Sequence, residues 1–438
     1  MSTIELGEIS SAPGEEPVRE FDLRTLRRLT IAVVGLLCLL GVTASARPEP
    51  PGGVRRLWSV PFADQDNATL GADSVYLSRS AGGRTRLTAY ELASGKVRWE
   101  TTLDGVLGYP QPAEPDGLLL LPADTEVATH GEFYAQYAQQ TVALDTRTGR
   151  ALWTEPGDSL LVARGAVLMA DHGDDGGYSG LRLIRLRDRS TVWQRPTPGA
   201  ISVAFALDGA GPERVITATS DGLIEILRFA DGGRIAAARI PWARPDPERG
   251  QWNDLTAGGD HLVVNRNVQG HAELSVYRLD SMTERWHADG TDGYAFPCGA
   301  SICVNNAGGL TAYEADSGRL VWRLPGIGSG WAPSAERVVV SDPDGGRQYL
   351  VDTATGQRVG ADVTGETVWR IEPGTALLVL KGTTAPPDRT SITRWDLATG
   401  RRELLGSTER IAVNRCQAVG HYLGCYVTSS YTVTAVGR

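Results

Sequence analysis

Short apolar runs separated by turn residues recur along most of the chain. Residues 294–324 show the pattern well, with the runs YAFPC, SICVN, GLTAYEA and RLVWRL divided by Gly, Asn, Asp and Ser. Runs of this length between turn residues predict an antiparallel meander of four short strands. One run differs from all others: Leu29–Ala46 is apolar and uncharged over 18 residues.

One phrase of the sequence is written twice almost unchanged. Residues 87–100 read LTAYELASGKVRWE and residues 310–323 read LTAYEADSGRLVWR, and weaker copies occur elsewhere, such as TVALDTRTGRALW at 141–153. The Trp of the phrase, or the residue in its place, falls at positions 58, 99, 153, 193, 237, 286, 322, 360 and 404. Most steps are 36–49 residues, the period of a four-stranded propeller blade, and the longer step from Trp99 to Trp153 contains an insertion.

The recurring residues suit architecture better than chemistry. The Asp-x-x-[Ser/Thr]-Gly turn supplies a left-handed glycine between the third and the outermost strand of each blade. Large aromatic residues that recur once per sheet fit packing between neighbouring blades. The predicted packing residues are Trp58, Tyr90, Trp99, Trp153, Trp193, Tyr277, Trp286, Tyr313 and Trp322.

The two ends of the repeat region complement each other. An outermost-strand signal at 57–62 has no module before it, and three inner-strand signals at 410–436 have no outermost strand after them. Pairing them would complete one blade and close the ring. We therefore predict an all-β propeller of four-stranded antiparallel blades over residues 54–438.

The repeated phrase resembles the pyrroloquinoline-quinone-type (PQQ-like) β-propeller repeat. That repeat occurs in quinoprotein alcohol dehydrogenases, in the non-enzymatic propeller lipoprotein of the outer-membrane protein assembly machine, and in exported proteins of Gram-positive bacteria. The resemblance implies a fold rather than an activity, because the repeat is architectural. Members of the family mostly have eight blades, so we expect eight here, although the markers allow nine.

The residues that the quinoprotein enzymes would require are missing from the sequence. The chain has no Cys-Cys dipeptide, which those enzymes place over the quinone, and no Cys-x-x-Cys-His haem motif. Asp171, Asp174 and Asp175 form a weak calcium candidate, but their spacing is not that of a known calcium loop. We expect a non-catalytic protein without a cofactor, with a quinone-dependent dehydrogenase as the alternative.

The N-terminal residues indicate export. Residues 1–28 are polar and predicted to be a disordered cytoplasmic tail, and 29–46 are long enough for a transmembrane signal anchor. A cleaved signal peptide is the alternative, since Ala44-Ser45-Ala46 fits a cleavage site. Residues 47–53 are then a short linker, and both readings place the propeller outside the cytoplasm, on a single-pass cell-membrane protein if the anchor is retained.

The cysteines agree with an oxidising compartment. Two close pairs, Cys298 with Cys303 and Cys416 with Cys425, each bracket a predicted hairpin, whose geometry suits a disulfide. Four buried free thiols are the alternative. The formal net charge of −9 argues against nucleic acid as a partner, because a nucleic-acid binder needs a basic face.

Two groups of aromatic residues are candidates for binding. The insertion 123–140 contains Phe133, Tyr134 and Tyr137, and is either a binding loop or a longer hairpin. A second group lies near the start of each innermost strand, beside the central channel, where it either binds a partner or seals neighbouring blades. This group consists of Tyr109, Trp252, Tyr294, Trp331 and Trp369.

These observations favour a monomeric, exported binding or scaffold module. The expected partner is an envelope protein or peptide, or a glycan, and the N-terminal helix would hold the membrane. A ligand sensor that signals through the helix is a further alternative, although only 28 residues would lie inside the cell.

Overall fold

The computed structural model describes residues 53–437 except 106, 131–132, 209–210, 244–245, 247–249, 269, 290–292, 307, 371–373 and 412–414. The predicted tail and transmembrane helix, and all of the linker except Gly53, lie outside these residues. Contacts divide the chain into two units, residues 1–51 and residues 52–438. Among the described residues, no helix has the length and apolar character needed to cross a membrane.

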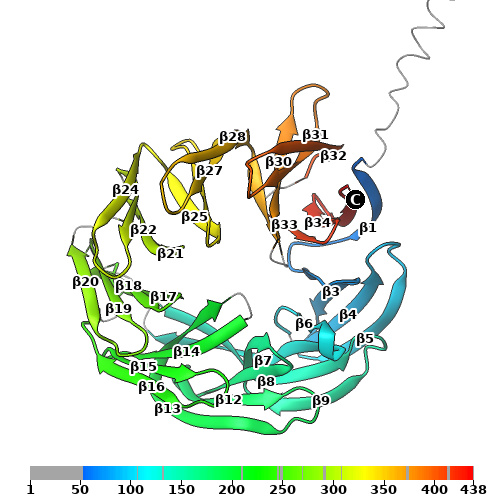
Figure 1. Ribbon diagram of the computed structural model, residues 1–438. Coiled ribbons are helices and arrows are strands. Elements are labelled where there is room, and N and C mark those ends of the chain that lie inside the picture. The colour runs from blue at the N-terminus through cyan, green and yellow to red at the C-terminus, as the bar shows by residue number, and fades with distance from the viewer. Residues whose placement is uncertain are drawn as a thin grey trace, which may run out of the picture. The chain divides into compact units, whose positions relative to one another are not determined.

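Within the described residues the second unit is built almost entirely of strands, and five of its sheets are four-stranded antiparallel meanders (Figure 1). In each of them the strands pair in chain order, as the sequence predicts. The first two sheets contain β2 (Asn67–Leu70), β3 (Ser74–Ala81), β4 (Arg84–Glu91) and β5 (Val97–Asp104), then β6 (Gln111–Ala113), β7 (Leu118–His130), β8 (Phe133–Asp145) and β9 (Ala151–Pro156).

The other three meanders follow later in the chain and have the same strand order. Their strands are β17 (Trp252–Gly258), β18 (His261–Val268), β19 (His271–Arg278), β20 (Glu284–Asp289), β21 (Ala295–Cys298), β22 (Ser301–Asn306), β23 (Gly309–Glu314), β24 (Leu320–Pro325), β25 (Ser329–Ser334), β26 (Arg337–Ser341), β27 (Arg347–Asp352) and β28 (Arg358–Thr364).

A seven-stranded sheet joins two meanders through one long strand, β13 (Thr191–Asp208). This strand is the last of one meander and the first of the next, because it continues past its pairing with β12 to pair with β14. The other strands are β10 (Asp158–Ala163), β11 (Ala166–His172), β12 (Tyr178–Arg185), β14 (Gly211–Thr219), β15 (Leu223–Arg228) and β16 (Arg234–Arg239).

An eight-stranded sheet contains both ends of the second unit. It holds the meander β29 (Glu366–Arg370), β30 (Ala376–Thr383), β31 (Arg389–Asp396) and β32 (Arg402–Glu409), and the strands β33 (Cys416–Val419), β34 (Tyr422–Val427), β35 (Ser430–Ala435) and β1 (Arg55–Pro61). Strand β1 pairs antiparallel with β35, with Trp58 opposite Val433. A short parallel pairing of β29 with β33 joins the two halves.

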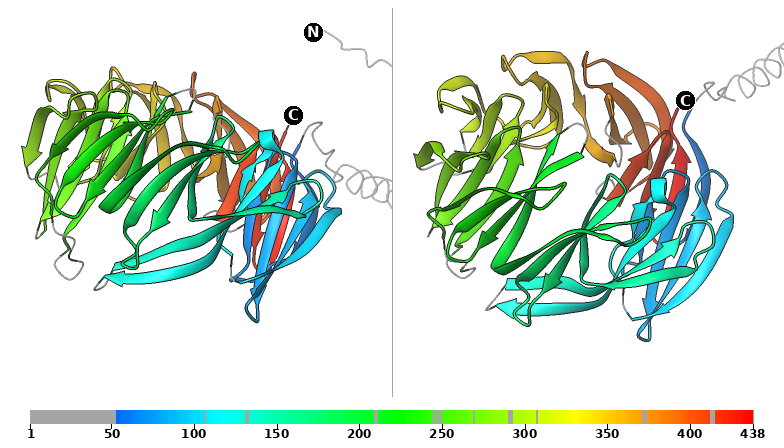
Figure 2. Two further views of the ribbon diagram at one scale, coloured as in Figure 1. Left: turned by 90° about the horizontal axis from the view of Figure 1, so that it is seen from below. Right: turned by 60° about the horizontal axis from the view of Figure 1, so that its bottom comes forward.

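The first strands of the meanders lie nearest the common centre and the fourth strands lie outside (Figures 1 and 2). Neighbouring first strands run in the same direction, as the parallel pairing of β29 and β33 shows. We call the face on which the first strands begin the front face. Fourth strands run the opposite way, so β1 begins at the back face.

At five positions the repeated Trp connects one meander to the next. Its indole Nε1 donates a hydrogen bond to a backbone carbonyl of the following meander, and its ring lies against the turn glycine three residues after that carbonyl. The pairs are Trp58 with Leu92 (2.9 Å), Trp99 with Thr146 (2.7 Å), Trp193 with Phe229 (2.7 Å), Trp286 with Ala315 (2.8 Å) and Trp322 with Thr353 (2.8 Å). The matching glycines are Gly95, Gly149, Gly232, Gly318 and Gly356.

Gly356 shows why this turn position is a glycine. Its φ of +70° is a left-handed conformation, and a Cβ there would lie 2.6 Å from Cγ of Trp322. In the turn before β20, Met282 takes the place of the glycine, with φ of +55°. The preceding meander has Ala236 of β16 at the position where the others have Trp. From the sequence we expected this repeat position at Ala237. The left-handed turn residue is Gly232, so the marker lies one residue earlier.

Both predicted disulfides are present. Cys416 and Cys425 are directly opposite each other in β33 and β34, with Cα atoms 4.2 Å apart. Cys298 and Cys303 bridge the hairpin of β21 and β22, with Cα atoms 5.8 Å apart. The prediction of two hairpin disulfides is confirmed, and the alternative of free thiols is not needed.

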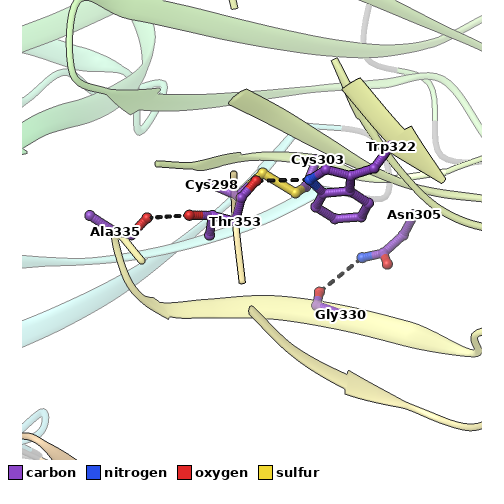
Figure 3. Close-up of a disulfide and its surroundings, with 7 residues drawn as sticks. All are labelled: Cys298, Cys303, Asn305, Trp322, Gly330, Ala335 and Thr353. Atoms are coloured by element: carbon purple, nitrogen blue, oxygen red, sulfur yellow. Dashed lines mark hydrogen bonds between the residues drawn. A yellow bond between two sulfur atoms is a disulfide. The ribbon is translucent and has the colours of Figure 1, made fainter. Parts of the chain in front are cut away.

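The disulfide of Cys298 and Cys303 lies within the contact between two sheets (Figure 3). Near it, Trp322 of one sheet bonds the Thr353 carbonyl of the next. The Asn305 side chain donates to the Gly330 carbonyl at 3.0 Å, which also connects these two sheets. Apolar packing and a few backbone-directed hydrogen bonds therefore hold neighbouring sheets together.

Other predicted packing residues also lie between sheets. Tyr90 stacks on Trp58 with ring centroids 5.5 Å apart, and Tyr313 meets Trp286 at the same distance. Tyr277 is buried among apolar residues of two neighbouring sheets, and Trp153 packs against the cluster that contains Leu186.

Candidate functional site

Three of the predicted aromatic residues are exposed at equivalent places on the front face. Tyr109 lies two residues before β6 and is 68% exposed, Tyr294 lies just before β21 and is 45% exposed, and Trp252 opens β17 and is 36% exposed. Because each lies at the start of a first strand, the three share one face of the molecule. Exposed rings of this size favour contact with another molecule.

The remaining members of this group differ from one another. Trp331 in β25 is half-buried and packs against the cluster that contains Val339 and Leu350, so it seals two sheets. The side chain of Trp369 lies outside the described part of the chain, and its backbone pairs with Gln417. Tyr294 also contacts the neighbouring sheet, since its hydroxyl lies 3.3 Å from the Thr256 hydroxyl.

The insertion is a long hairpin, the second of its two predicted forms. Strands β7 and β8 pair continuously from Leu118 opposite Asp145 to His130 opposite Phe133, so the hairpin extends beyond the front face. Tyr137 is buried rather than displayed: its ring stacks on His172 of β11 at 4.4 Å, and its hydroxyl donates to Glu126 at 3.2 Å. Burial, with Glu126 adding to it, raises the pKa of Tyr137.

The side chains of Phe133 and Tyr134 lie outside the described residues. Because its ring stacks on His172, Tyr137 anchors the hairpin to the neighbouring sheet.

The acidic loop at 171–175 does not converge on one point. Asp171 forms an ion pair with Arg182 at 3.0 Å, and Asp175 accepts a hydrogen bond from the Gly177 backbone. Asp174 is exposed. Across the described residues there is no group of three or more His, Cys, Asp or Glu side chains placed to hold a metal ion.

A cavity of about 430 Å³ opens on the front face where the first and last strands of the second unit meet. The connection from β1 to β2 forms one wall. The start of β33, together with the hairpin of β34 and β35, forms another wall, and Tyr109 forms the rim. We call it the junction cavity, and it is lined by Phe62, Asp64, Asp66, Asn67, Ala68, Tyr109, Arg415, Cys416, Gln417, Gly424, Tyr426 and Tyr431.

The charged groups of the junction cavity are paired internally. Asp66 is buried and accepts hydrogen bonds from Arg79 at 3.0 Å and from the Ala63 backbone at 2.9 Å. Asp64 is exposed and accepts from Arg415 at 3.3 Å and from the Tyr426 hydroxyl at 3.1 Å. Burial and the hydrogen bond to Asp64 raise the pKa of Tyr426.

One hydroxyl of the cavity wall has no partner among the described residues. Tyr431 is only 4% exposed, and its hydroxyl makes no hydrogen bond there. It lies against Gly424, where any side chain would overlap it. Burial raises the pKa of Tyr431, which keeps the hydroxyl protonated. A buried hydroxyl without a hydrogen-bond partner is costly, so a ligand group that reached it would gain a hydrogen bond.

Of the cavity residues, only Tyr109 was predicted from the sequence as a binding residue, and Cys416 was predicted only as part of a disulfide. The others escaped because the wall is made by segments some 350 residues apart, which the pairing of β1 with β35 brings together. The complementary chain ends were the available signal, since they predicted which strands would meet.

Comparisons with known proteins match part of the repeat region to a family model. The family model described as outer membrane protein assembly factor BamB matches residues 49–200. No curated protein has a significantly similar sequence.

Solved structures resemble the whole propeller region at low identity. A eukaryotic initiation factor matches with TM-score 0.51 and 13% identity, covering 82% of this chain and 90% of the other. BamB from Moraxella catarrhalis matches with TM-score 0.41 and 15% identity, covering 87% and 97%. The dihydro-heme d1 dehydrogenase NirN matches with TM-score 0.41 and 11% identity, covering 73% and 74%. At 13% identity the likeness to the initiation factor shows a shared fold and no shared activity.

Proposed function

The chain is a PQQ-like β-propeller protein similar to BamB, and from this premise we propose that it is a non-catalytic binding module that recognises its partner with the front face. The observation that carries the proposal is the equivalent placement of Tyr109, Trp252 and Tyr294, which are 68%, 36% and 45% exposed. Large exposed aromatic rings cost free energy in water and supply most of the binding energy in many interfaces.

The proposed ring has nine blades rather than the eight expected from the family. The support comes from strand pairing: five separate meanders, two meanders that share β13, and two that are joined by β29 and β33. Each meander also shares an apolar cluster with the next, and the cluster that contains Phe62, Leu70 and Tyr431 joins the last meander to the first. Cryo-electron microscopy of the purified chain would show nine blades, and eight would overturn this count.

The proposed location is the outer side of the cell membrane. The disulfides support export, because such bonds persist in oxidising compartments. The test is labelling of the full chain in intact cells with a membrane-impermeant reagent, which should reach an engineered cysteine at Tyr109. A lack of labelling until the cells are lysed would refute export.

In-cell photocrosslinking tests the binding surface itself. A photoreactive residue at position 109, 252 or 294 should crosslink to a shared partner. The matched control positions are Val97 and Leu320, which are 56% and 53% exposed on outermost strands at the back face. Equal crosslinking from both faces, or none from the front face, would refute the proposal.

The alternative enzyme reading has its own measurement. The non-catalytic proposal expects that the purified chain incubated with pyrroloquinoline quinone and calcium reduces no redox dye with simple alcohols. Sustained dye reduction above a boiled control would instead establish a quinoprotein dehydrogenase.

A further inference from the structure

We propose that the junction cavity binds a neutral saccharide, either free or as part of a larger glycan. The sugar's apolar ring face would lie against Tyr109, and its hydroxyl groups would bond the polar side chains of the wall. This inference rests on the proposed function, because it names the chemistry that one part of the front face recognises.

The pairing of charges in the cavity favours a neutral ligand. The carboxylate of Asp66 is already neutralised by Arg79, and that of Asp64 by Arg415. A charged ligand group near Asp66 would have to separate its largely buried pair with Arg79 or remain uncompensated, and both cost free energy. A hydroxyl group can instead bond a carboxylate or guanidinium without breaking the pair, since each has further hydrogen-bonding positions.

The aromatic walls fit a flat ligand with an apolar face. Tyr109 displays most of its ring at the rim. Tyr426 lies beneath Arg415, with the guanidinium 4.9 Å from the ring centroid, and packs against Phe62 with centroids 5.4 Å apart. This stacking holds Tyr426 and Arg415 in place before a ligand arrives, and a site fixed in advance loses less entropy on binding.

The hydroxyl of Tyr431 is the second, independent sign of a ligand. It is buried in the cavity wall and has no hydrogen-bond partner among the described residues. A tyrosine hydroxyl can both donate and accept, as a sugar hydroxyl can, so one ligand hydroxyl would satisfy it in either direction.

The backbone beside the cavity argues for a saccharide over an added peptide strand. A peptide that extends a sheet needs free backbone donors and acceptors at the sheet edge. On β2, the first strand of the first blade, this edge is partly closed. The amide of Leu70, the last residue of β2, already donates to the Gln417 side chain at 3.3 Å. The polar groups offered to a ligand therefore come from side chains.

The size of the cavity suits a small oligosaccharide. Its volume of about 430 Å³ falls in the range of small-molecule sites, with room for roughly one or two sugar rings. A longer glycan could continue over the front face.

The test is ligand-detected saturation-transfer NMR on the purified full chain. The probes are short linear oligosaccharides of glucose, mannose and N-acetylglucosamine, together with neutral, basic and acidic tripeptides. We expect saturable binding of at least one oligosaccharide. Tyr109→Ala should weaken it about tenfold, as loss of an aromatic contact to the ligand does.

Tyr431→Phe is the most informative variant. It removes a single unpartnered hydroxyl, so we expect weaker saccharide binding with an unchanged or higher Tm, which rules out misfolding as the cause. The matched controls are Leu320→Ala, an exposed apolar residue at the back face, and Asp104→Asn, an exposed carboxylate paired with Arg84 elsewhere. Both should bind like the wild type.

Three outcomes would overturn the inference: no oligosaccharide binds, the cavity variants bind as well as the controls do, or a tripeptide binds in their place. Each is distinct from failure of the proposed function. Front-face crosslinking to a protein partner could still occur without any saccharide binding, and would then support the binding module alone.

Discussion

The contact between Trp322 and Gly356 predicts a specific difference between two otherwise similar glycine substitutions. Gly356 has φ of +70° and lies under the Trp322 ring, whereas Gly345 has φ of +68° with no atom near its missing Cβ. Gly345→Ala should therefore cost only the left-handed strain of an alanine, about 1 kcal/mol. Gly356→Ala pays the same strain and also forces the indole away.

The additional cost of Gly356→Ala follows from the geometry. A Cβ placed 2.6 Å from Cγ of Trp322 is far inside van der Waals contact, and overpacking of this kind costs about 1–3 kcal/mol. Movement of the ring also strains the 2.8 Å hydrogen bond from its Nε1 to Thr353, worth about 1 kcal/mol. We expect Gly356→Ala to be less stable than Gly345→Ala by about 2–3 kcal/mol.

Urea unfolding followed by circular dichroism measures this difference, provided that both variants keep the wild-type slope. A double-mutant cycle isolates the cause: in the Trp322→Ala background, Gly356→Ala should cost no more than Gly345→Ala. Equal destabilisation by the two glycine substitutions in the wild-type background would refute the idea that Trp and Gly positions are coupled between sheets.

Three further predictions concern the hairpins, the turns and the insertion. Replacing Cys416 and Cys425 by Ala should lower the free energy of unfolding by about 2–3 kcal/mol, from the loop-entropy relation, as measured by urea unfolding under non-reducing conditions; no change would show that the bond does not form. Hydrogen bonds from Thr148, Thr355 and Thr399 hold the pKa values of Asp145, Asp352 and Asp396 below the usual range. Their contribution to stability is thus present above about pH 4 and is lost as the pH falls through the lowered values, so a triple Asp→Asn variant should show a flatter loss of stability in acid. An unchanged pH profile would contradict this. Tyr137→Ala should speed proteolysis within the β7–β8 hairpin, since it removes the stack on His172, while Val127→Ala, at an exposed position, should not.

Much of the fold could be read from local patterns. Short apolar runs between turn residues predicted four-stranded meanders, the Asp-x-x-[Ser/Thr]-Gly turn predicted the left-handed residue before each outermost strand, and close cysteine pairs predicted hairpin disulfides. Each of these features depends on residues within about ten positions of one another, where turn chemistry and strand period act directly. The repeated Trp was correctly expected to pack between sheets, but its hydrogen bond to a carbonyl of the next sheet was not foreseen.

The candidate site was less accessible to sequence reasoning. Periodicity placed Tyr109, Trp252, Tyr294 and Trp331 at equivalent positions, yet the first three are displayed and Trp331 is half-buried between two sheets. Equal spacing along the chain sets the strand position of a ring, whereas its exposure depends on the neighbouring sheet. Tyr137 shows the same point, because its place in an insertion suggested a binding loop and the stack on His172 makes it an anchor.

The sequence by itself determined the repeat, its four-stranded unit and the pairing of the chain ends, because these follow from local hydrophobic period and turn residues. Only the tertiary structure decided that Asp64, Arg415, Tyr426 and Tyr431 surround one cavity. These residues come from opposite ends of the chain, and none carries a local signal of binding. They meet because β1 pairs with β35, so the position of the site depends on a long-range contact that no short stretch of sequence specifies.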